Sequence, residues 1–361
     1  MNKKLKVGIL GATGMVGQRF ISCLEGHPWY DISVVAASPN SAGKSYTEAV
    51  GSRWSMSTPI PSGVANMTVG NASDIASIAG QVDFVFCAVD MGKEEIRKLE
   101  EDYARHEVPL VSNNSAHRST PDVPMMIPEI NSDHAAIIEF QRKRLGTKRG
   151  FIAVKPNCSL QSYVPAIAPL MGFGPKDIAV CTYQAISGAG KTFETWPEMV
   201  DNVIPYIGGE EEKSEREPLK IFGRIVGGKI ENAVEPNFTA QCIRVPASDG
   251  HMAAVFVRFA KKPSKDDILS LWRNAKGRPQ ELSLPSAPRP FLTYLEEDNR
   301  PQTQLDRDTG KGMGITLGRL RTDSVFDYKF VGLSHNTLRG AAGGAILTAE
   351  LLTADGYITP A

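Results

Sequence analysis

The first half of the chain alternates between short apolar runs and polar stretches with helical character. The apolar runs lie at residues 6–10, 32–37, 82–89, 108–111 and 151–154. Runs of this length predict buried strands, and near-continuous apolar character is typical of parallel strands covered on both faces. Residues 93–106 have the charged pattern of a surface helix. The alternation therefore predicts an α/β fold built on a parallel sheet.

A glycine-rich turn joins the first predicted strand to a helix. The turn is Gly-Ala-Thr-Gly-Met-Val-Gly at 11–17, and residues 18–24 continue with helical spacing. The first glycine allows a tight turn, the second lets a pyrophosphate approach the backbone, and the third lets the helix pack on the strand. The helix N-terminus then receives anionic phosphates. We expect a Rossmann dinucleotide-binding unit, with cofactor contacts from Gly11, Thr13, Gly14, Met15, Val16 and Gly17.

The loop after the second strand bears on the choice of cofactor. An NAD-preferring unit usually places an acidic residue there to bind the ribose 2′-hydroxyl. Residues 38–45 instead read Ser-Pro-Asn-Ser-Ala-Gly-Lys-Ser, without a carboxylate. Ser38, Ser41 and Lys44 suit a 2′-phosphate, so the loop favours NADP. The alternative is a polar loop that does not discriminate between the two cofactors.

Cys158 stands at a junction of the kind that produces a reactive thiol. It follows the strand 151–154 and the turn Lys155-Pro156-Asn157, and residues 159–167 have the apolar spacing of a helix. Unpaired N–H groups and the helix dipole at such a position favour thiolate over thiol, which predicts a nucleophile. A lone cysteine is otherwise a small buried hydrophobe. We apply that second interpretation to Cys23, Cys87, Cys181 and Cys242.

Polar loops at the ends of other strands supply candidate binding groups. Arg118 lies in the loop 112–118, and its planar guanidinium suits phosphate or carboxylate, although a surface arginine is the alternative. The strand 180–185 carries Gln184, which either positions a substrate group or is structural. It runs into the Gly/Ser loop 186–191, where the backbone can approach a ligand closely.

Arg244 and His251 flank a turn and can face one site. His251 precedes the strand 253–259. Histidine is the usual proton shuttle near neutral pH, and arginine is the usual carboxylate clamp. A hydrogen-bonded loop histidine is the alternative for His251. The polar segment 263–322 predicts a helix at 265–275 followed by turns. It offers no candidate catalytic or binding residue.

The chain closes with a stretch dense in small residues, 333–350, that predicts a helix. Small side chains permit close packing against another element. The helix either joins a bundle or returns to the cofactor domain near the nicotinamide. The second hypothesis is the more specific one.

Composition and charge narrow the class of protein. The chain has 361 residues, enough for roughly two domains, and 40 basic residues balance 40 acidic ones. Nothing therefore favours nucleic acid or an anionic membrane as a partner. The five cysteines show no CxxC spacing, and the chain has no signal-peptide pattern or long apolar segment. We expect free thiols in a reducing cytoplasm, with neither a disulfide framework nor a metal site.

Several segments together resemble the aspartate-β-semialdehyde dehydrogenase family, in the branch found in archaea and fungi. They occur in the family's order from Val7 to about Leu351. The segments are GATGMVGQRF, SAGKSY, SNNSAHR, PNCSLQ, YQAISGAGKT, GGEEEKSEREPLKI, RVPASDGH and HNTLRGAAGGA.

The resemblance implies a role for each matching residue. Cys158 is the nucleophile, His251 the acid–base catalyst, and Gln184 orients the acyl group. Arg244 holds the substrate α-carboxylate, and Glu210 accepts the α-amino group, with Glu211 as the alternative. The remaining substrate and cofactor residues implied are Asn157, Arg118 and Lys213 at the phosphate or oxyanion, and Ser187, Gly188, Asn336 and Thr337 at the cofactor.

The resemblance also implies an architecture and a reaction. The expected architecture is an NADP-binding Rossmann domain at 1–157, completed by 336–361, and an α+β catalytic and dimerisation domain at 158–335 in a homodimer or homotetramer. The expected reaction is NADPH-dependent reduction of L-4-aspartyl phosphate to L-aspartate 4-semialdehyde through a Cys158 thioester. It belongs to lysine, threonine and methionine biosynthesis.

Three rival functions stay open on the sequence. Malonyl-CoA reductase and N-acetyl-glutamyl-phosphate reductase share the fold and the catalytic Cys/His pair. Their substrates lack the free amino group that Glu210 would bind. A non-catalytic NADP-binding sensor is a different class, because fold alone does not give function. It has no need for Cys158, Gln184, Arg244 and His251 together.

Overall fold

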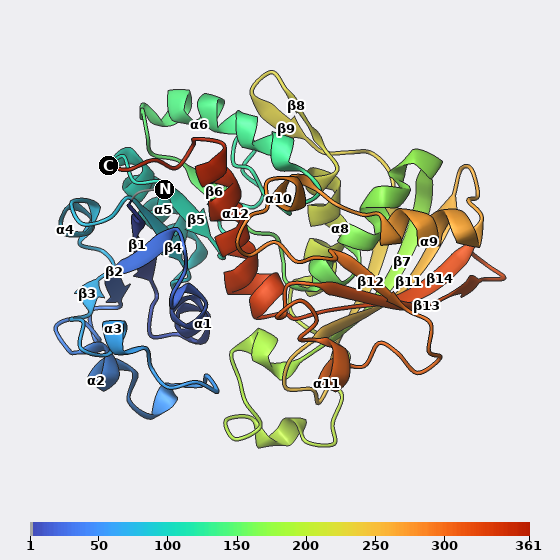
Figure 1. Cartoon of the computed structure of the whole chain (residues 1–361), viewed down its shortest axis with the longest axis horizontal. Coiled ribbons are helices and arrows are strands. Elements are labelled where there is room, and N and C mark those ends of the chain that lie inside the picture. The colour runs from blue at the N-terminus through green and yellow to red at the C-terminus, as the bar shows by residue number, and fades with distance from the viewer. Residues whose placement is uncertain (1–2) are drawn as a thin grey trace.

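The chain folds around two β-sheets that lie side by side, with a C-terminal helix between them (Figure 1). The computed structural model describes residues 3–361. The first sheet holds strands from the first half of the chain, and the second sheet holds strands from the second half.

The first sheet is parallel and has six strands in the order β3-β2-β1-β4-β5-β6. This is the strand order of a Rossmann dinucleotide-binding unit, as the sequence predicts. The strands are β1 (Leu5–Leu10), β2 (Tyr30–Ala37), β3 (Gly70–Asn71), β4 (Phe84–Cys87), β5 (Leu110–Ser112) and β6 (Ile152–Val154).

Helices connect these strands, since parallel neighbours need crossover connections. The α-helices are α1 (Met15–Leu24), α2 (Tyr46–Val50), α3 (Ser62–Ala65), α4 (Ile75–Ala79), α5 (Lys93–Arg105) and α6 (Ile138–Leu145). Two 3₁₀ segments, η1 (Gly51–Arg53) and η2 (Ser132–Ile137), extend the connections.

The turn between β1 and α1 depends on two glycines. Gly11 has a φ of 84°, a conformation that side chains other than glycine rarely adopt. A Cβ at Gly17 would collide with the backbone of Gly11 and Ala12. A Cβ at Gly14 would meet only the Gly11 carbonyl oxygen, at 3.6 Å, so this position is open on its outer side.

The second sheet is mixed and has six strands in the order β10-β7-β11-β14-β13-β12. Its strands are β7 (Pro175–Gln184), β10 (Asn237–Arg244), β11 (His251–Phe259), β12 (Leu292–Leu295), β13 (Ile315–Thr322) and β14 (Tyr328–Ser334). A separate antiparallel pair is formed by β8 (Arg224–Val226) and β9 (Lys229–Glu231).

Helical segments cover one face of this sheet and link it to the first. The α-helices are α7 (Val164–Ile167), α8 (Glu210–Ile221), α9 (Lys265–Arg273), α10 (Arg278–Glu281), α11 (Thr303–Asp306) and α12 (Gly343–Ala354). The other helical segments are η3 (Ser159–Ser162), η4 (Ala168–Phe173), η5 (Ile186–Ala189), η6 (Pro197–Met199) and the π-helical η7 (Leu338–Ala342).

The last helix, α12, returns to the first sheet, as the more specific hypothesis predicts. Its apolar side chains share one buried cluster with β1, β2 and α1. Two buried polar contacts fix the helix: the hydroxyls of Tyr30 and Thr353 lie 2.9 Å apart, and His27 Nε2 lies 2.8 Å from the Glu350 carboxylate. The red helix in Figure 1 therefore packs as part of the first half.

Three of the predicted elements are wrong in detail. The segment 263–322 holds two sheet strands, β12 and β13, besides the predicted helix. Residues 333–337 are not helical, because β14 runs to Ser334. The predicted helix over 159–167 is instead η3 and α7, interrupted at Tyr163, whose φ of −140° is not helical.

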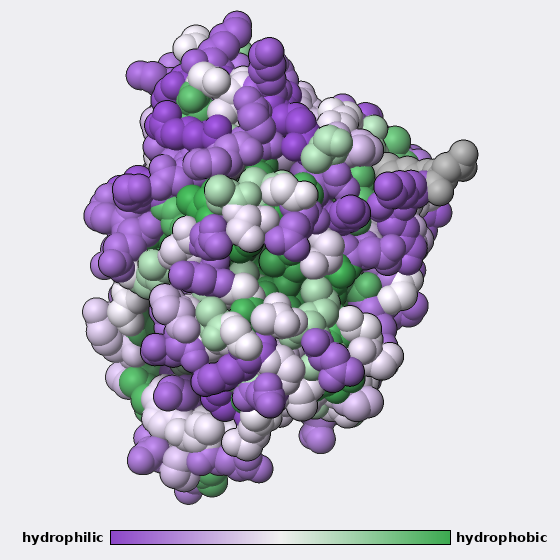
Figure 2. All heavy atoms as spheres, turned by 90° about the vertical axis from the view of Figure 1, so that its left-hand side faces the viewer, coloured by the Kyte–Doolittle hydropathy of each residue, from purple (hydrophilic) through white to green (hydrophobic). Residues whose placement is uncertain are grey.

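Polar residues dominate the face of the molecule at the first-sheet side, and apolar residues show between them in the middle of that face (Figure 2). Among the described residues, every helix is too short or too polar to span a lipid bilayer.

Candidate active site

Cys158 lies where the first sheet ends and the second half of the chain begins. It follows β6 and the turn 155–157, and it occupies the N-cap position of η3. The residue as a whole is partly exposed, whereas Cys87 and Cys242 are buried. Gly340 of η7 packs against it, because a Cβ at Gly340 would lie 2.9 Å from Cys158 Cβ.

The charge state of Cys158 differs from the sequence-based expectation. Burial raises the pKa of the thiol, and the Glu210 carboxylate raises it further; the cations Lys155, Arg118 and Arg244 oppose both effects. The short 3₁₀ segment that follows is a poor substitute for a full α-helix dipole, which sums over many aligned peptides. The resting site therefore favours the thiol, and formation of a thiolate needs a proton acceptor.

Asn157 fixes the turn that presents the sulfur. Its Oδ1 accepts from Ser159 N at 2.9 Å, and its Nδ2 donates to both oxygens of the Glu210 carboxylate at 2.9 Å. Its backbone N–H donates to Glu217 Oε2 at 2.6 Å. Both ends of the Asn157 amide are thus bound to protein, so the side chain joins Cys158 to α8.

Glu210 begins α8 and collects three donors. Besides Asn157, the Lys213 ammonium donates to Oε1 at 2.8 Å and Gln184 Nε2 donates to Oε2 at 3.2 Å. Burial raises the pKa of this carboxyl, but Lys213 and the hydrogen bonds outweigh burial and bring the pKa below its usual value. Glu210 is therefore ionised near neutral pH and lies beside the nucleophile.

The neighbouring carboxylate, Glu211, points elsewhere. Its Oε1 accepts from Gln241 Nε2 at 2.7 Å and from Cys242 N at 3.2 Å, on strand β10. Successive helix residues lie about 100° apart around the axis, so only one of the two can face Cys158. Of the two alternatives that the sequence leaves open, the geometry favours Glu210.

Arg118 reaches the site from the loop after β5. Its Nη1 donates to Glu217 Oε1 at 3.0 Å and its Nη2 donates to the Asn113 carbonyl at 3.0 Å. The backbone of its loop is held by Lys220, whose Nζ donates to the carbonyls of Arg118 and Thr120 at 2.7 Å each. Arg118 Nε is buried and has no partner among the described residues.

His251 and Arg244 share one anchor, the peptide of Ala185. Ala185 N–H donates to His251 Nδ1 at 3.1 Å, and Arg244 Nη1 donates to the Ala185 carbonyl at 2.7 Å. Burial, reinforced by the Arg244 cation, lowers the pKa of His251 to about 3. The ring is neutral, and because Nδ1 accepts a hydrogen bond its proton is on Nε2, which is buried without a partner among the described residues.

The loop 186–190 covers these two side chains. A Cβ at Gly188 would lie 3.0 Å from Arg244 Nη1 and from His251 Nε2, so only a glycine leaves room there. Asn336 holds the loop in place: its Nδ2 donates to Ser187 Oγ at 2.8 Å, and its Oδ1 accepts from Gly250 N at 2.8 Å. Thr337 follows and is buried.

The candidate cofactor groups lie on the neighbouring side. The N-terminus of α1 has no side-chain cap, which leaves its first N–H groups free for an anion. A cavity of about 120 Å³ is lined by Met15 and Arg19 of α1, by Ser187 of the covering loop and by Lys191 directly after it. The glycine-rich turn and the loop above His251 therefore border one space.

The loop after β2 brings the three candidates for the 2′-phosphate into one turn. Ser38 and Lys44 are exposed and Ser41 is buried in the same turn. Lys44 Nζ donates to the Asn40 carbonyl at 3.1 Å, which lays the cation across the turn. The carboxylate of Glu48 is already occupied by Ser45 N and Oγ, at 2.9 and 2.7 Å.

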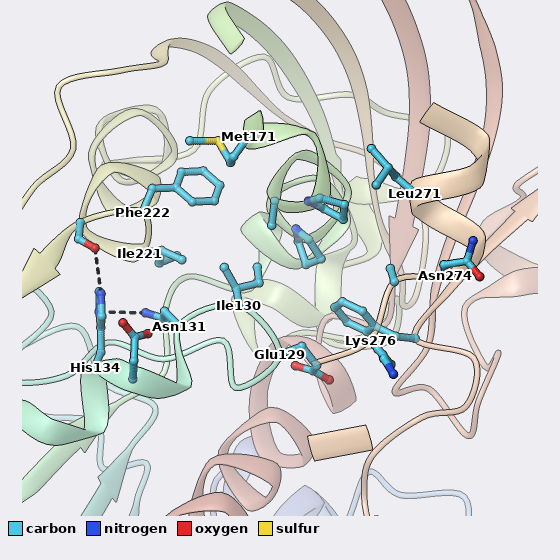
Figure 3. Close-up of a pocket in the computed structure, with 17 residues that line it drawn as sticks. Glu129, Ile130, Asn131, His134, Met171, Ile221, Phe222, Leu271, Asn274 and Lys276 are labelled. Carbon is cyan, nitrogen blue, oxygen red and sulfur yellow. Dashed lines mark hydrogen bonds between the residues drawn. The ribbon is translucent and has the colours of Figure 1, made fainter. Parts of the chain in front are cut away.

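Two larger cavities differ in their relation to this site. One, of about 710 Å³, is lined by Arg118, Lys213, Glu217 and Lys220 and therefore includes two of the candidate phosphate-binding residues, Arg118 and Lys213. The other, of about 570 Å³, includes Met171 and His134 and none of the candidate residues (Figure 3). Among residues 3–361, no group of three or more His, Cys, Asp or Glu side chains is arranged to hold a metal ion.

Comparison with known proteins identifies the family. The family models described as semialdehyde dehydrogenase, NAD binding domain, and semialdehyde dehydrogenase, dimerisation domain, match residues 6–138 and 167–339. The aspartate-semialdehyde dehydrogenase of Archaeoglobus fulgidus is 41% identical over 97% of this chain and 98% of its own length. The chain belongs to the aspartate-semialdehyde dehydrogenase family.

Fungal members and a solved structure of this family support the same assignment. The enzyme of Aspergillus fumigatus is 39% identical over 98% of this chain and 99% of its own. The crystal structure of the Candida albicans enzyme with NADP superposes with a TM-score of 0.88 at 36% identity, over 99% of this chain and 100% of that chain. The predicted resemblance to the archaeal and fungal branch and the predicted fold are thus confirmed.

Some groups of the site carry no signal in a single sequence. Lys155 and Glu217 are buried beside Cys158 and Asn157, and Gln18 is buried under the glycine-rich turn, donating to the Thr13 carbonyl at 3.0 Å. Tyr46 also supports this turn, since its hydroxyl donates to the Ala12 carbonyl at 2.9 Å. The position of Lys155 directly before Pro-Asn-Cys is the one sequence feature that points to such a group.

Proposed function

We propose that this protein reduces L-4-aspartyl phosphate to L-aspartate 4-semialdehyde and phosphate with NADPH, reversibly, through a thioester on Cys158. One observation carries the assignment. Cys158 lies near the cations Arg118 and Arg244 and one ionised carboxylate, Glu210, and Lys213 pairs with that carboxylate. A substrate with two anionic ends and one ammonium group matches this set of charges.

Each charged group of the site binds a different part of the substrate. Arg244 holds the α-carboxylate, and Glu210 accepts the α-ammonium group, exchanging part of its contact with Lys213. Arg118 and Lys213 hold the phosphate at the mouth of the 710 Å³ cavity. Gln184 and Asn157 keep Glu210 in place through their amide donors and so orient the acyl group.

The chemistry then proceeds at Cys158 in two stages. The sulfur attacks the acyl phosphate and expels phosphate, leaving a thioester, which divides one difficult reduction into two easier steps. NADPH, when bound, supplies hydride to the carbonyl carbon of that thioester. The Nε2–H of His251 donates to the carbonyl oxygen as negative charge develops, because a neutral imidazole is a hydrogen-bond donor at this nitrogen. Collapse releases the aldehyde and frees the sulfur.

The residues present fit the proposed cofactor. The uncapped N-terminus of α1 and the open side of Gly14 suit a pyrophosphate. Ser38, Ser41 and Lys44 suit a 2′-phosphate, and the solved Candida albicans relative is described as a structure with NADP. Ser187, Gly188, Asn336 and Thr337 would hold the nicotinamide part of the cofactor, and Ser187 lines one cavity with Met15 of α1.

The open face of the second sheet supports a homo-oligomer. Along β7 and β11, buried residues alternate with half-buried ones, and the half-buried set is largely apolar: Ala179, Cys181, Tyr183, Met252, Ala254 and Phe256. A second copy of the chain, related by a two-fold axis, would bury this face against the same face of its partner. We assign residues 158–335 to a catalytic and dimerisation domain, residues 1–157 with 336–361 to the cofactor domain, and the protein to the cytoplasm.

A direct assay separates this function from its rivals. Reductive turnover is followed as NADPH oxidation with L-4-aspartyl phosphate and, in parallel, with malonyl-CoA. Faster oxidation with aspartyl phosphate is expected, because Glu210 has an amino group to bind only in that substrate. Faster oxidation with the thioester contradicts the assignment, and no oxidation with either substrate while NADPH binds favours a sensor.

A further inference from the structure

Charged side chains line the cavity of about 710 Å³ beside the site, and most of them are positive. A cleft with an excess of one sign of charge concentrates ions of the opposite sign, so this cavity favours an anionic ligand. The cations are Lys93, Arg118, Lys213, Arg216 and Lys220, and the carboxylates are Glu212, Glu217 and Glu231.

The inner end of this cavity reaches the residue before the nucleophile. Glu217 lines the cavity, and its carboxylate accepts from Asn157 N, directly before Cys158, at 2.6 Å. Arg118 Nη1 donates to the same carboxylate at 3.0 Å. Arg118 and Lys213, which the proposed function assigns to the phosphate, are called the inner pair below.

Both halves of the chain contribute cations to the wall of the cavity. Lys213, Arg216 and Lys220 recur at intervals of three and four residues along α8, which places them on one side of the helix. Lys93 is the first residue of α5, in the first half of the chain. An anion in the cavity therefore meets side chains from α5 and from α8.

The cations differ in what they already bind. The inner pair and Lys220 each donate to a carboxylate or a carbonyl of the protein. Lys93 and Arg216, called the outer pair below, are exposed, and their side chains have no hydrogen-bond or ion-pair partner within residues 3–361. A ligand can therefore bind the outer pair without breaking a contact inside the protein.

We propose that Lys93 and Arg216 form an outer anion site that takes up inorganic phosphate before it reaches the inner pair. A guanidinium presents a planar fork to phosphate oxygens, and an ammonium adds a point charge. In the reductive direction the same site receives the phosphate that the thioester step releases. The inference rests on the proposed function for the use of phosphate as a reactant and adds a second binding site for it.

The first test measures the outer site on the wild type and needs no turnover. Phenylglyoxal modifies accessible arginines, and mass spectrometry follows the rate at Arg216 with and without saturating inorganic phosphate, at an ionic strength matched with chloride. Phosphate should slow modification of Arg216 at least about fivefold. Arg321, exposed on β13, should react at the same rate in both buffers. Equal rates at Arg216 with phosphate and with chloride overturn the proposal.

Single variants show which side chains share the bound phosphate with Arg216. Lys93→Gln should raise the phosphate concentration for half-protection of Arg216 at least about threefold. Glu212→Gln should lower it about twofold, because this exposed carboxylate lies one helical turn before Arg216 and repels an anion. The control Lys265→Gln removes an exposed lysine that opens α9, as Lys93 opens α5, and should match the wild type. An unchanged value in Lys93→Gln, or an equal rise in Lys265→Gln, overturns the shared site.

Steady-state kinetics in the oxidative direction connect the site to the reaction. In Lys93→Gln/Arg216→Gln the KM for phosphate should rise at least about fivefold, while the KM for L-aspartate 4-semialdehyde stays within about twofold. The matched control is Lys261→Gln/Lys265→Gln, which removes two exposed positive charges outside the cavity and should keep both values. An unchanged KM for phosphate, or an equal rise in both KM values, overturns the proposal. Protection of Arg216 by phosphate in a wild type that does not turn over the semialdehyde contradicts the proposed function alone.

Discussion

At the scale of single residues, the site combines one buried group kept ionised by its hydrogen-bond donors with one kept neutral by burial. Glu210 stays charged because Lys213, Asn157 and Gln184 donate to it, whereas His251 stays neutral because it is fully buried beside Arg244. The same environment therefore supplies an anion for the substrate ammonium and a neutral donor for the substrate oxygen.

The two adjacent carboxylates offer a matched pair of variants. Glu210→Gln removes the charge beside Cys158 and should raise the KM for aspartyl phosphate at least about tenfold, as expected for one desolvated ionic contact. Glu211→Gln changes the residue bound to β10 and should leave the KM within about twofold. Steady-state kinetics with both variants check this, and equal effects contradict the assignment of Glu210.

His251 should make the fold sensitive to acid. Its folded pKa, about 3, is below the usual 6.5, so the unfolded chain binds more protons between these values and stability falls as pH falls through that window. At pH 5 the histidine costs roughly 2 kcal/mol relative to pH 7.5. Urea unfolding at both pH values should therefore show a smaller acid loss in His251→Gln than in the wild type.

The exposed His106 supplies the control for this experiment. His106→Gln should lose as much stability in acid as the wild type. A His251→Gln variant whose acid loss matches that of the wild type contradicts a buried neutral histidine.

Most of the residues that we propose to contact substrate are candidates from sequence, because their chemical types are unusual in their settings. Cys158 before a helical segment and Arg118 after a parallel strand are two examples. Their supports could not be found in this way. Glu217 and Lys220 act on residues roughly 100 positions away, at Arg118, and only the folded chain brings them together.

At the scale of elements, the turn between β1 and α1 combines a packing glycine with a ligand-facing glycine. Gly17→Ala places a Cβ against the backbone of Gly11 and Ala12 and should cost about 1–3 kcal/mol of stability. Gly14→Ala meets only the Gly11 oxygen at 3.6 Å and should stay within about 1 kcal/mol of the wild type.

The same pair separates stability from cofactor binding. Gly14→Ala should still weaken NADPH binding at least about tenfold, because a methyl group then stands where the pyrophosphate approaches. Thermal unfolding and NADPH titration measure the two effects. Tight NADPH binding by a stable Gly14→Ala contradicts the placement of the pyrophosphate.

Two physical causes explain the elements missed from sequence. β12 and β13 lie in a segment rich in Pro, Arg and Lys, and both strands are near the sheet edge, where polar side chains are tolerated. The element α8 begins with three glutamates, whose charge hides its amphipathic pattern. The first sheet could be predicted because its strands are covered on both faces and are apolar throughout.

At the scale of the whole molecule, the open face of the second sheet predicts self-association. Ala254→Arg places a charge in the middle of this face and should give a single chain in sedimentation analysis, whereas we expect a dimer or tetramer for the wild type. Ala76→Arg, on the exposed surface of α4, is the matched control and should sediment as the wild type does. An assembled Ala254→Arg variant contradicts this interface.

The central claim is that Cys158 carries an aspartyl group between the two halves of the reaction. The most direct measurement mixes the enzyme with L-4-aspartyl phosphate in the absence of NADPH and identifies the acylated peptide by mass spectrometry. We predict one aspartyl group per chain, on Cys158, which disappears when NADPH is added and is absent from Cys158→Ser. Acylation at another residue, or turnover by Cys158→Ser, contradicts the account.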